Sequence, residues 1–188
     1  MSIAEQPVRT TFKSFEESTP ADWAVIGSQA HLVEEMVADN ALWLLRRMGA
    51  DFGGFPVSRL EHSLQTATRA LRDGRSDDYV VCALLHDIGD TLSPGRFHPE
   101  VAATMVEGRV SEADHFMVKH HGVFQGYYFW DKIGGDRHAR EAFRTSPYFE
   151  HAAEFCARYD QVAFDPDYRS EPLEHFEPLL RAFFAPRR

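Results

Sequence analysis

The sequence contains little cysteine. Its two cysteines, Cys82 and Cys156, stand in unrelated contexts, and no CxxC pair occurs among the 188 residues. This spacing argues against zinc sites built from thiolates. Two isolated cysteines are typical of buried thiols in a reducing compartment, so no disulfide is required. Any metal site in this chain therefore depends on other ligand types.

Long hydrophobic runs are also missing. No apolar run approaches the roughly 18 residues that a membrane-spanning helix needs. The first residues, MSIAEQPVRTTFKSF, lack the apolar core of a signal peptide. We therefore expect a cytoplasmic protein that has no membrane partner.

Basic residues are outnumbered, because 29 acidic residues face 20 basic ones and the formal net charge is −9. No basic stripe follows any segment, which argues against nucleic acid as a partner. The overall field would mildly repel an anionic substrate unless the binding pocket is locally positive. A small-molecule ligand is the partner that this composition favours, and the sequence gives no oligomeric state.

Strand patterns are absent as well, since neither sustained alternation nor an Asn-Gly hairpin occurs. Helical periodicity dominates, which predicts an all-α single domain. We expect an N-terminal arm over residues 1–20 and a helical metal-binding domain over residues 21–188. Helices are expected over residues 29–48, 58–74, 77–89, 99–108, 111–122, 136–145, 148–164 and 173–184.

Ten histidines are the unusual feature of the composition. Buried imidazoles and carboxylates must be paired, hydrogen-bonded or bound to metal. Several histidines and aspartates of this sequence stand in apolar or aromatic surroundings. These candidate ligands are His62 (LEHSLQ), His86 and Asp87 (ALLHDIGD), His98 (FHPE), His120 or His121 (VKHHG) and Asp160 (ARYDQ). Imidazole and carboxylate together suit iron, manganese or zinc without thiolate help. The remaining histidines, at positions 31, 115, 138, 151 and 175, are expected to be exposed or locally hydrogen-bonded.

Each candidate has a simpler interpretation when taken alone. His62 could be a core histidine that donates to a carbonyl, His98 a loop residue, and Asp160 the partner of an arginine. The order of all of them on successive helices is more specific than any one. Adjacent His86 and Asp87 would point about 100° apart on a helix, so Asp87 could bridge two ions while His86 binds one.

The order of His62, His86-Asp87 and Asp160 resembles the signature of the HD-domain superfamily, which contains metal-dependent phosphohydrolases and a smaller oxygenase branch. The additional pair, His98 and His121, resembles the two-metal members. The segments VSRLEHSLQTATRA, FHPEVAATM, MVKHHGVFQGYY and CARYDQVAFDP are similar to the PhnZ-type oxygenases and, more distantly, to myo-inositol oxygenase. The resemblance covers residues 52–167.

The resemblance implies an HD-domain helical bundle that holds two metal ions. Around one ion it implies His62, His86, Asp87 and Asp160, and around the other Asp87, His98 and His121. Asp87 and His121 are the implied catalytic positions. The branch uses a mixed-valent Fe(II)/Fe(III) pair and O2 to cleave a C–P or C–C bond in a small hydroxylated substrate. Two iron ions are thus the implied cofactors, with manganese or zinc as alternatives.

Hydrolysis remains the alternative, because two divalent ions about 3.5–4 Å apart can also activate water for phosphoryl displacement. Phosphohydrolases share the same ligand order. A third possibility is a binding module with a structural metal cage, but seven ligand bonds for two ions leave coordination positions open. The residues around His62 and around Asp160 resemble those of the oxygenase branch, which favours the oxygenase.

The substrate-recognition residues of the branch do not carry over. A lysine that contacts phosphonate there is replaced by Gln125, which becomes the first candidate for substrate contact, together with Tyr127, His120 and Phe55. Gln65 is expected next to the ligand shell, while Phe129 and Trp130 are expected to pack in the core. The segment 52–55 is either a lid or an ordinary loop. The cations that could hold an anionic group are Lys119, Lys132, Arg96 and Arg158.

Overall fold

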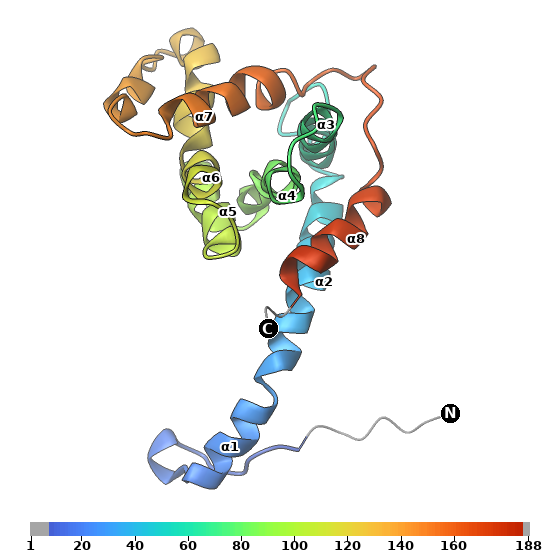
Figure 1. The fold of residues 1–188 in the computed structure, drawn as a ribbon, viewed down its shortest axis with the longest axis vertical. Coiled ribbons are helices and arrows are strands. Elements are labelled where there is room, and N and C mark those ends of the chain that lie inside the picture. The colour runs from blue at the N-terminus through green and yellow to red at the C-terminus, as the bar shows by residue number, and fades with distance from the viewer. Residues whose placement is uncertain (1–7, 186–188) are drawn as a thin grey trace.

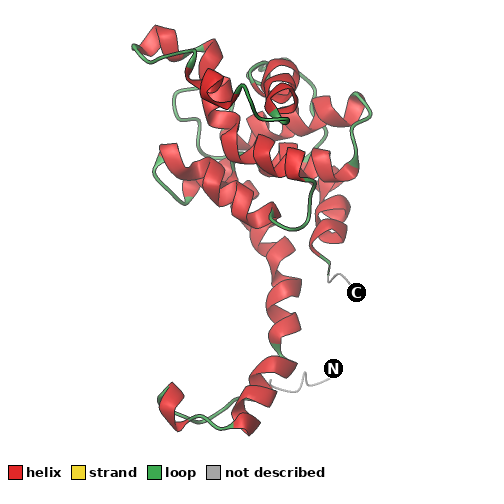
Figure 2. Ribbon diagram, turned by 60° about the vertical axis from the view of Figure 1, so that its left-hand side comes forward, coloured by secondary structure: helices red, strands yellow, loops and turns green. Residues whose placement is uncertain are grey.

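The computed structural model describes residues 8–185, without the side chains of residues 33–35. Residues 1–7 of the predicted arm therefore lie outside the described part. Eight α-helices follow one another: α1 Pro20–Ser28, α2 Ala30–Met48, α3 Arg59–Arg72, α4 Asp77–Leu85, α5 His98–Val106, α6 Glu112–Gln125, α7 Phe149–Phe155 and α8 Leu173–Phe184. Residues 8–185 contain no strand (Figure 2), which confirms the all-α prediction.

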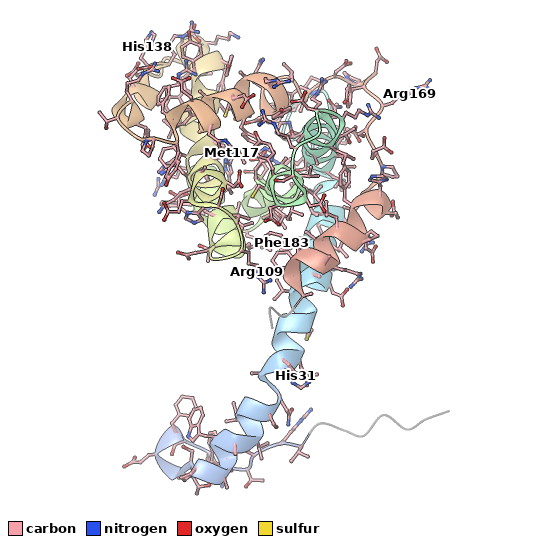
Figure 3. The ribbon with its side chains drawn as sticks, in the orientation of Figure 1. His31, Arg109, Met117, His138, Arg169 and Phe183 are labelled. Carbon is pink, nitrogen blue, oxygen red and sulfur yellow. The ribbon has the colours of Figure 1, made fainter. Side chains whose placement is uncertain are left out.

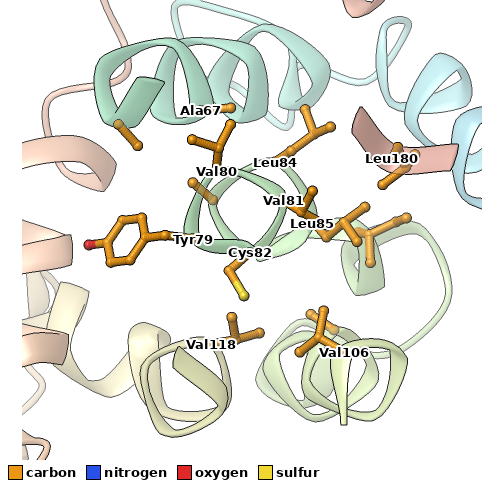
Figure 4. Close-up of a cluster of buried hydrophobic side chains, with 14 of the residues drawn as sticks. Ala67, Tyr79, Val80, Val81, Cys82, Leu84, Leu85, Val106, Val118 and Leu180 are labelled. Carbon is orange, nitrogen blue, oxygen red and sulfur yellow. The ribbon is translucent and has the colours of Figure 1, made fainter. Parts of the chain in front are cut away.

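Helix α4 is the centre of the core. All its residues from Tyr79 to Leu85 are buried, as expected for a helix that is apolar on every side. Figure 4 shows α4 end-on, with Ala67 of α3, Val106 of α5, Val118 of α6 and Leu180 of α8 around it. The end of α4 is therefore held by packing on all sides, and this end carries the His-Asp pair.

Serine caps begin the helices that surround the site. The side chains of Ser58, Ser76 and Ser111 each accept a hydrogen bond from a backbone N–H in the first turn of α3, α4 and α6. Such a cap satisfies one of the free donors at a helix start. The predicted starts of α3 and α6 are thus confirmed by their cap geometry.

Three predicted helices differ from the observed ones. Helix α4 ends at Leu85 rather than Gly89, because a turn and then the 3-10 helix η2 (Ile88–Thr91) replace its last turn. The segment 136–145 forms only the 3-10 helix η6 (Ala139–Phe143). Helix α7 ends at Phe155 and continues as a π-helical turn, η7 (Cys156–Asp160). Such turns are found at functional sites.

Helix α1 was not predicted, although its start carries a complete capping box between Thr19 and Asp22 and a proline at the first position. Together with the first turns of α2 it projects away from the helices that form the core (Figure 1). Among the described residues, no helix is both long enough and apolar enough to cross a membrane.

Candidate metal centre

Two polar side chains follow directly after the buried helix α4. His86 is fully buried and Asp87 is 9% exposed. They occupy the turn between α4 and η2, where Asp87 has φ −102° and ψ 8°. The helix on which a 100° separation was expected therefore ends before both residues.

The structure brings all six predicted ligands together. α3 supplies His62, the end of α4 supplies His86 and Asp87, α5 supplies His98, α6 supplies His121 and η7 supplies Asp160. Nε2 of His62 lies 3.1 Å from Nε2 of His86, and Nε2 of His98 lies 2.9 Å from Nε2 of His121. The four rings thus form two pairs, and within each pair the two Nε2 atoms face each other.

The carboxylate of Asp87 stands between the two histidine pairs. Its Oδ2 lies 3.3 Å from Nε2 of His62 and 3.4 Å from Nε2 of His86. Its Oδ1 lies 3.1 Å from Nε2 of His98 and 3.0 Å from Nε2 of His121. Each oxygen therefore serves one pair, which is the arrangement required of a carboxylate that bridges two ions.

Asp160 belongs to the first pair only. Its Oδ1 lies 3.2 Å from Nε2 of His62 and 3.8 Å from Nε2 of His86. His62, His86 and Asp160 form one group with ligand atoms within 4.8 Å of one another, and His86, Asp87 and His121 form a second. His86 thus belongs to both groups, and His98 to neither. The division into the two sets that the resemblance implies rests on the Asp87 distances; the role of the six residues as ligands stays a prediction.

The other nitrogen of each ring contacts a backbone carbonyl. Nδ1 of His62 lies 3.1 Å from the oxygen of Ala163, that of His86 2.8 Å from Ala83, and that of His121 2.7 Å from Val118. Nδ1 of His98 contacts the carbonyl of Gly95 in the same way.

A carbonyl can only accept, so Nδ1 of each ring must be the donor and a neutral ring carries a free lone pair on Nε2. Four lone pairs and two carboxylates converging on one space repel one another unless protons or cations lie between them. The donor set, four imidazoles and two carboxylates, fits first-row transition metals, so these residues are suited to hold two such ions.

Without metal, protons must balance the two carboxylates. Burial lowers the pKa of His62, but hydrogen bonds to Asp160 and Asp87 outweigh it and raise the pKa to about 10. Burial likewise lowers the pKa of His98, and Asp87 and Asp90 raise it to about 9. Burial raises the pKa of Asp87, but the neighbouring histidines overcome this and hold it well below its usual value. The site thus attracts positive charge strongly.

Asp160 is held in place by neighbours outside the histidine cluster. The side-chain amide of Gln125 donates to Oδ1 of Asp160 over 2.6 Å, and the thiol of Cys156 donates to Oδ2 over 3.7 Å. Gln125 was predicted to contact substrate. That call stays a prediction: the side chain lines the cavity, and its amide also orients a candidate ligand.

Asp90 and Phe164 contact candidate ligand histidines, and neither was singled out from the sequence. Oδ1 of Asp90 lies 3.1 Å from Nδ1 of His98, and the other oxygen of Asp90 accepts from Arg59. The ring of Phe164 stacks on His62 with 4.4 Å between centroids. A carboxylate behind a ligand histidine fixes the ring and raises its basicity. The only signal in the sequence was the second aspartate of HDIGD.

A cavity of about 470 Å³ opens onto one side of the cluster. His62, Asp87 and His98 line it, whereas His86 and His121 are fully buried behind them. Its walls include Phe55, Tyr128, Phe129 and Phe164. Phe55 therefore lies at the cavity, where the sequence placed it, and it stacks on Phe164 with 5.3 Å between centroids. Phe129, expected in the core, is 37% exposed and lines the cavity instead.

The remaining predicted site residues lie elsewhere. His120 packs between Phe116 and Phe143, with both ring centroids 4.5 Å away, and lines a different surface hollow. Tyr127 lies under the guanidinium of Arg140, 3.6 Å from its ring centroid, and is not among the described residues that line the cavity. Both were candidates for substrate contact, and the structure brings neither to the cluster of candidate ligands.

Gln65 is buried and binds the backbone of Asp165; its predicted place next to the ligand shell stays a prediction. Its amide donates to the carbonyl of Asp165 over 2.7 Å, and its oxygen accepts from the N–H of Asp165 over 3.3 Å. The pair of bonds ties α3 to the loop that carries Phe164. Gln65 therefore acts on the site by holding this loop in place.

The other histidines are distributed over the periphery. Figure 3 shows His31 on the projecting part of α2 and His138 at the far end of the molecule from it. Nε2 of His151 donates to Oδ1 of Asp114 over 2.8 Å. These residues therefore lie outside the cluster, as expected.

Part of the chain is similar to known proteins. The profile of the HD domain matches residues 59–159, the segment from the first residue of α3 to the residue before Asp160. The chain is also 38% identical over 72 residues to a 1-hydroxy-2-(trimethylamino)ethylphosphonate dioxygenase (glycine-betaine-forming) of Leisingera caerulea. That similarity covers 33% of this chain, and the chain spans 37% of the relative's length.

Proposed function

The chain belongs to the HD-domain family, and on that premise we propose that it is a dinuclear-metal oxygenase. The proposed reaction uses O2 to cleave a C–P or C–C bond in a small hydroxylated, anionic substrate. The proposed cofactors are two iron ions in a mixed-valent pair. The observation that carries the proposal is the division of the Asp87 oxygens between His62–His86 on one side and His98–His121 on the other.

The six candidate ligands would hold two ions and would leave coordination positions on them open. His62, His86, Asp87 and Asp160 would hold one ion, and Asp87, His98 and His121 the other. When bound, such an iron pair supplies electrons for the activation of O2 and a Lewis-acidic position for a substrate oxygen. Seven ligand bonds for two ions leave room for both, so the site is suited to catalysis rather than to a closed structural cage.

The chain's own residues control access to these positions. His86 and His121 are buried on the closed side, and the cavity meets the cluster at His62, Asp87 and His98. Substrate must therefore approach from this side. Phe55, Phe129 and Phe164 form apolar walls there, which exclude water from the reacting atoms and protect reactive species from side reactions.

The similarity to the Leisingera caerulea enzyme supports an oxygenase over a hydrolase. The name of that enzyme states that it acts on a hydroxylated phosphonate that carries a trimethylamino group. We extend to this chain only the reaction class and a small hydroxylated anion as substrate. Aromatic walls can also accommodate a quaternary ammonium group, so substrates of that kind belong in the first screen.

One experiment separates the oxygenase from metal-dependent phosphohydrolysis. The protein is purified without oxygen, its metals are quantified, and low-temperature EPR spectra are recorded before and after addition of candidate hydroxyphosphonates. We expect two iron ions per chain and a mixed-valent signal that substrate perturbs, with O2 consumed on turnover. Manganese or zinc in the site, with release of phosphate from phosphate esters and no O2 uptake, would instead establish the hydrolase.

A further inference from the structure

Among the described residues, the basic side chains other than histidine that line the cavity over the metal centre are Arg59 and Lys132. Arg59 is already neutralised. Its Nε donates to Oδ2 of Asp51 over 2.8 Å, and its Nη1 donates to Asp90. Two carboxylates face this one guanidinium, so Arg59 has no unbalanced charge to offer a ligand.

Lys132 is in a different situation. It lies in the 3-10 helix η5 (Trp130–Ile133), is exposed, and lines the cavity, so it stands where the cavity meets solvent. Its ammonium donates to the carbonyl of Tyr128 over 3.1 Å. The adjacent Asp131 pairs with Arg137 at 3.3 Å. Within residues 8–185, no ion pair joins Lys132 to a carboxylate, so two of its three donors are available.

The acidic groups of the cavity do not compete for this charge. Asp87 is surrounded by four imidazoles, and Asp90 contacts both His98 and Arg59. Each is engaged with positive charge or with candidate metal ligands. Lys132 is thus the unbalanced charge of this cavity, in a chain whose net charge is −9.

The other basic residues that the sequence analysis named as able to hold an anionic group lie elsewhere. Lys119 lines a separate hollow with Phe116 and Tyr148. Arg158 pairs with Asp73 at 2.7 Å and Glu154 at 3.0 Å. Arg96 stacks on Phe97 and is not among the described residues that line the cavity. The amide of Gln125 is used by Asp160.

We propose that Lys132 binds a phosphate or phosphonate group that is remote from the bond to be cleaved, while the hydroxylated end of the substrate reaches the metal centre. The inference deepens the proposed function, because it assigns the anionic group of the substrate to one end of the same cavity. Lys132 is then a specificity-determining residue of the site.

The test is equilibrium binding of methylphosphonate, an anion without the hydroxyl group, to the iron-loaded protein under argon. Isothermal titration calorimetry compares the wild type with Lys132→Met, Lys132→Arg and the matched control Lys119→Met. We expect Lys132→Met to raise the Kd about tenfold, in line with loss of one charge-assisted hydrogen bond. Lys132→Arg should retain most of the affinity, and Lys119→Met should equal the wild type.

Dimethyl methylphosphonate, the uncharged ester, checks that charge is what Lys132 recognises. It should bind weakly, and Lys132→Met should not change its binding. Melting temperature and iron content accompany each variant, and because Lys132 is exposed we expect both to stay unchanged.

The inference is overturned if methylphosphonate fails to bind the wild type at millimolar concentration, or if Lys132→Met binds it within twofold of the wild type. It is also overturned if Lys119→Met weakens binding equally. These outcomes are independent of the reaction: a mixed-valent EPR signal with an unaffected Lys132→Met variant would remove only this inference. Phosphatase activity with a Lys132-dependent Kd would remove only the oxygenase.

Discussion

The amide of Gln125 donates a 2.6 Å hydrogen bond to Oδ1 of Asp160, the same oxygen that faces His62. α6 and the π-helical turn η7 are thus joined at a candidate ligand. A partner of this kind fixes the direction of the ligand atom, and its loss typically weakens metal affinity by about 10–100-fold.

We therefore predict that Gln125→Leu lowers the affinity for one of the two ions by about tenfold and leaves the other unchanged. Competition with a chelator, followed by metal analysis, measures both. Gln125→Glu serves as the second variant, because its carboxylate adds repulsion next to Asp160 and should weaken the same ion further. A variant with both ions intact but weak methylphosphonate binding would show that Gln125 contacts substrate instead.

The adjacent histidines of α6 give a second prediction, because they face opposite surroundings. His121 is fully buried in the cluster, whereas His120 packs on Phe116 and Phe143. His121→Ala should reduce the metal content from two ions to about one per chain. His120→Ala should keep two ions, which makes it the matched control. Metal loss in His120→Ala with full occupancy in His121→Ala would reverse the assignment.

Asp87 should behave differently from every other candidate ligand. Because its two oxygens face different histidine pairs, Asp87→Ala removes a ligand from both ions at once. We predict that this variant binds neither ion tightly, whereas Asp160→Ala keeps the ion between His98 and His121. Metal analysis of the two variants distinguishes them, and equal retention of one ion in both would exclude a bridging carboxylate.

Asp90 provides the fourth prediction. Its carboxylate joins Nδ1 of His98 to Arg59, which in turn holds Asp51 at the start of the loop that carries Phe55. Asp90→Asn keeps the shape but removes the charge behind His98. The ion on the His98 side should then bind about 10-fold more weakly, as chelator competition would measure. Thr104→Ala, on an exposed turn of α5, is a control that should change nothing.

The sequence predicted which six side chains lie together, because each stands in a short motif whose position depends on a single helix. His62 follows the cap at Ser58, and His86 and Asp87 follow the apolar run of α4. Packing around α4 then brings these helix ends together. Local patterns are sufficient here, because the fold needs only to bury one apolar helix among its neighbours.

The walls of the cavity could not be predicted in the same way. Phe129 and Lys132 reach the cavity, while Tyr127 turns away beneath Arg140. These residues lie between α6 and α7, where short 3-10 helices replace any periodic pattern. Each side chain there is directed by one turn and by tertiary contacts. The same reason explains Asp87, whose direction is set by the turn after α4.

The final prediction concerns pH. In the metal-free protein the pKa of His62 is raised to about 10 and that of His98 to about 9, above the roughly 6.5 of an unfolded chain. The folded state therefore holds protons that the unfolded state has lost between pH 6.5 and 10. Their stabilisation is complete below pH 6.5 and disappears as the pH rises through these folded-state values.

The free energy of unfolding of the metal-free protein should thus fall between pH 6.5 and 9.5. A loss of 1 kcal/mol lowers the melting temperature of a domain of this size by about 2–4 °C, and we expect a fall of at least ~5 °C. In the metal-loaded protein the ions take the place of the protons, so its melting temperature should change far less. Thermal melts of both forms at the two pH values measure the difference. Parallel curves for the two forms would mean that the imidazole protons and the metal ions do not share one site.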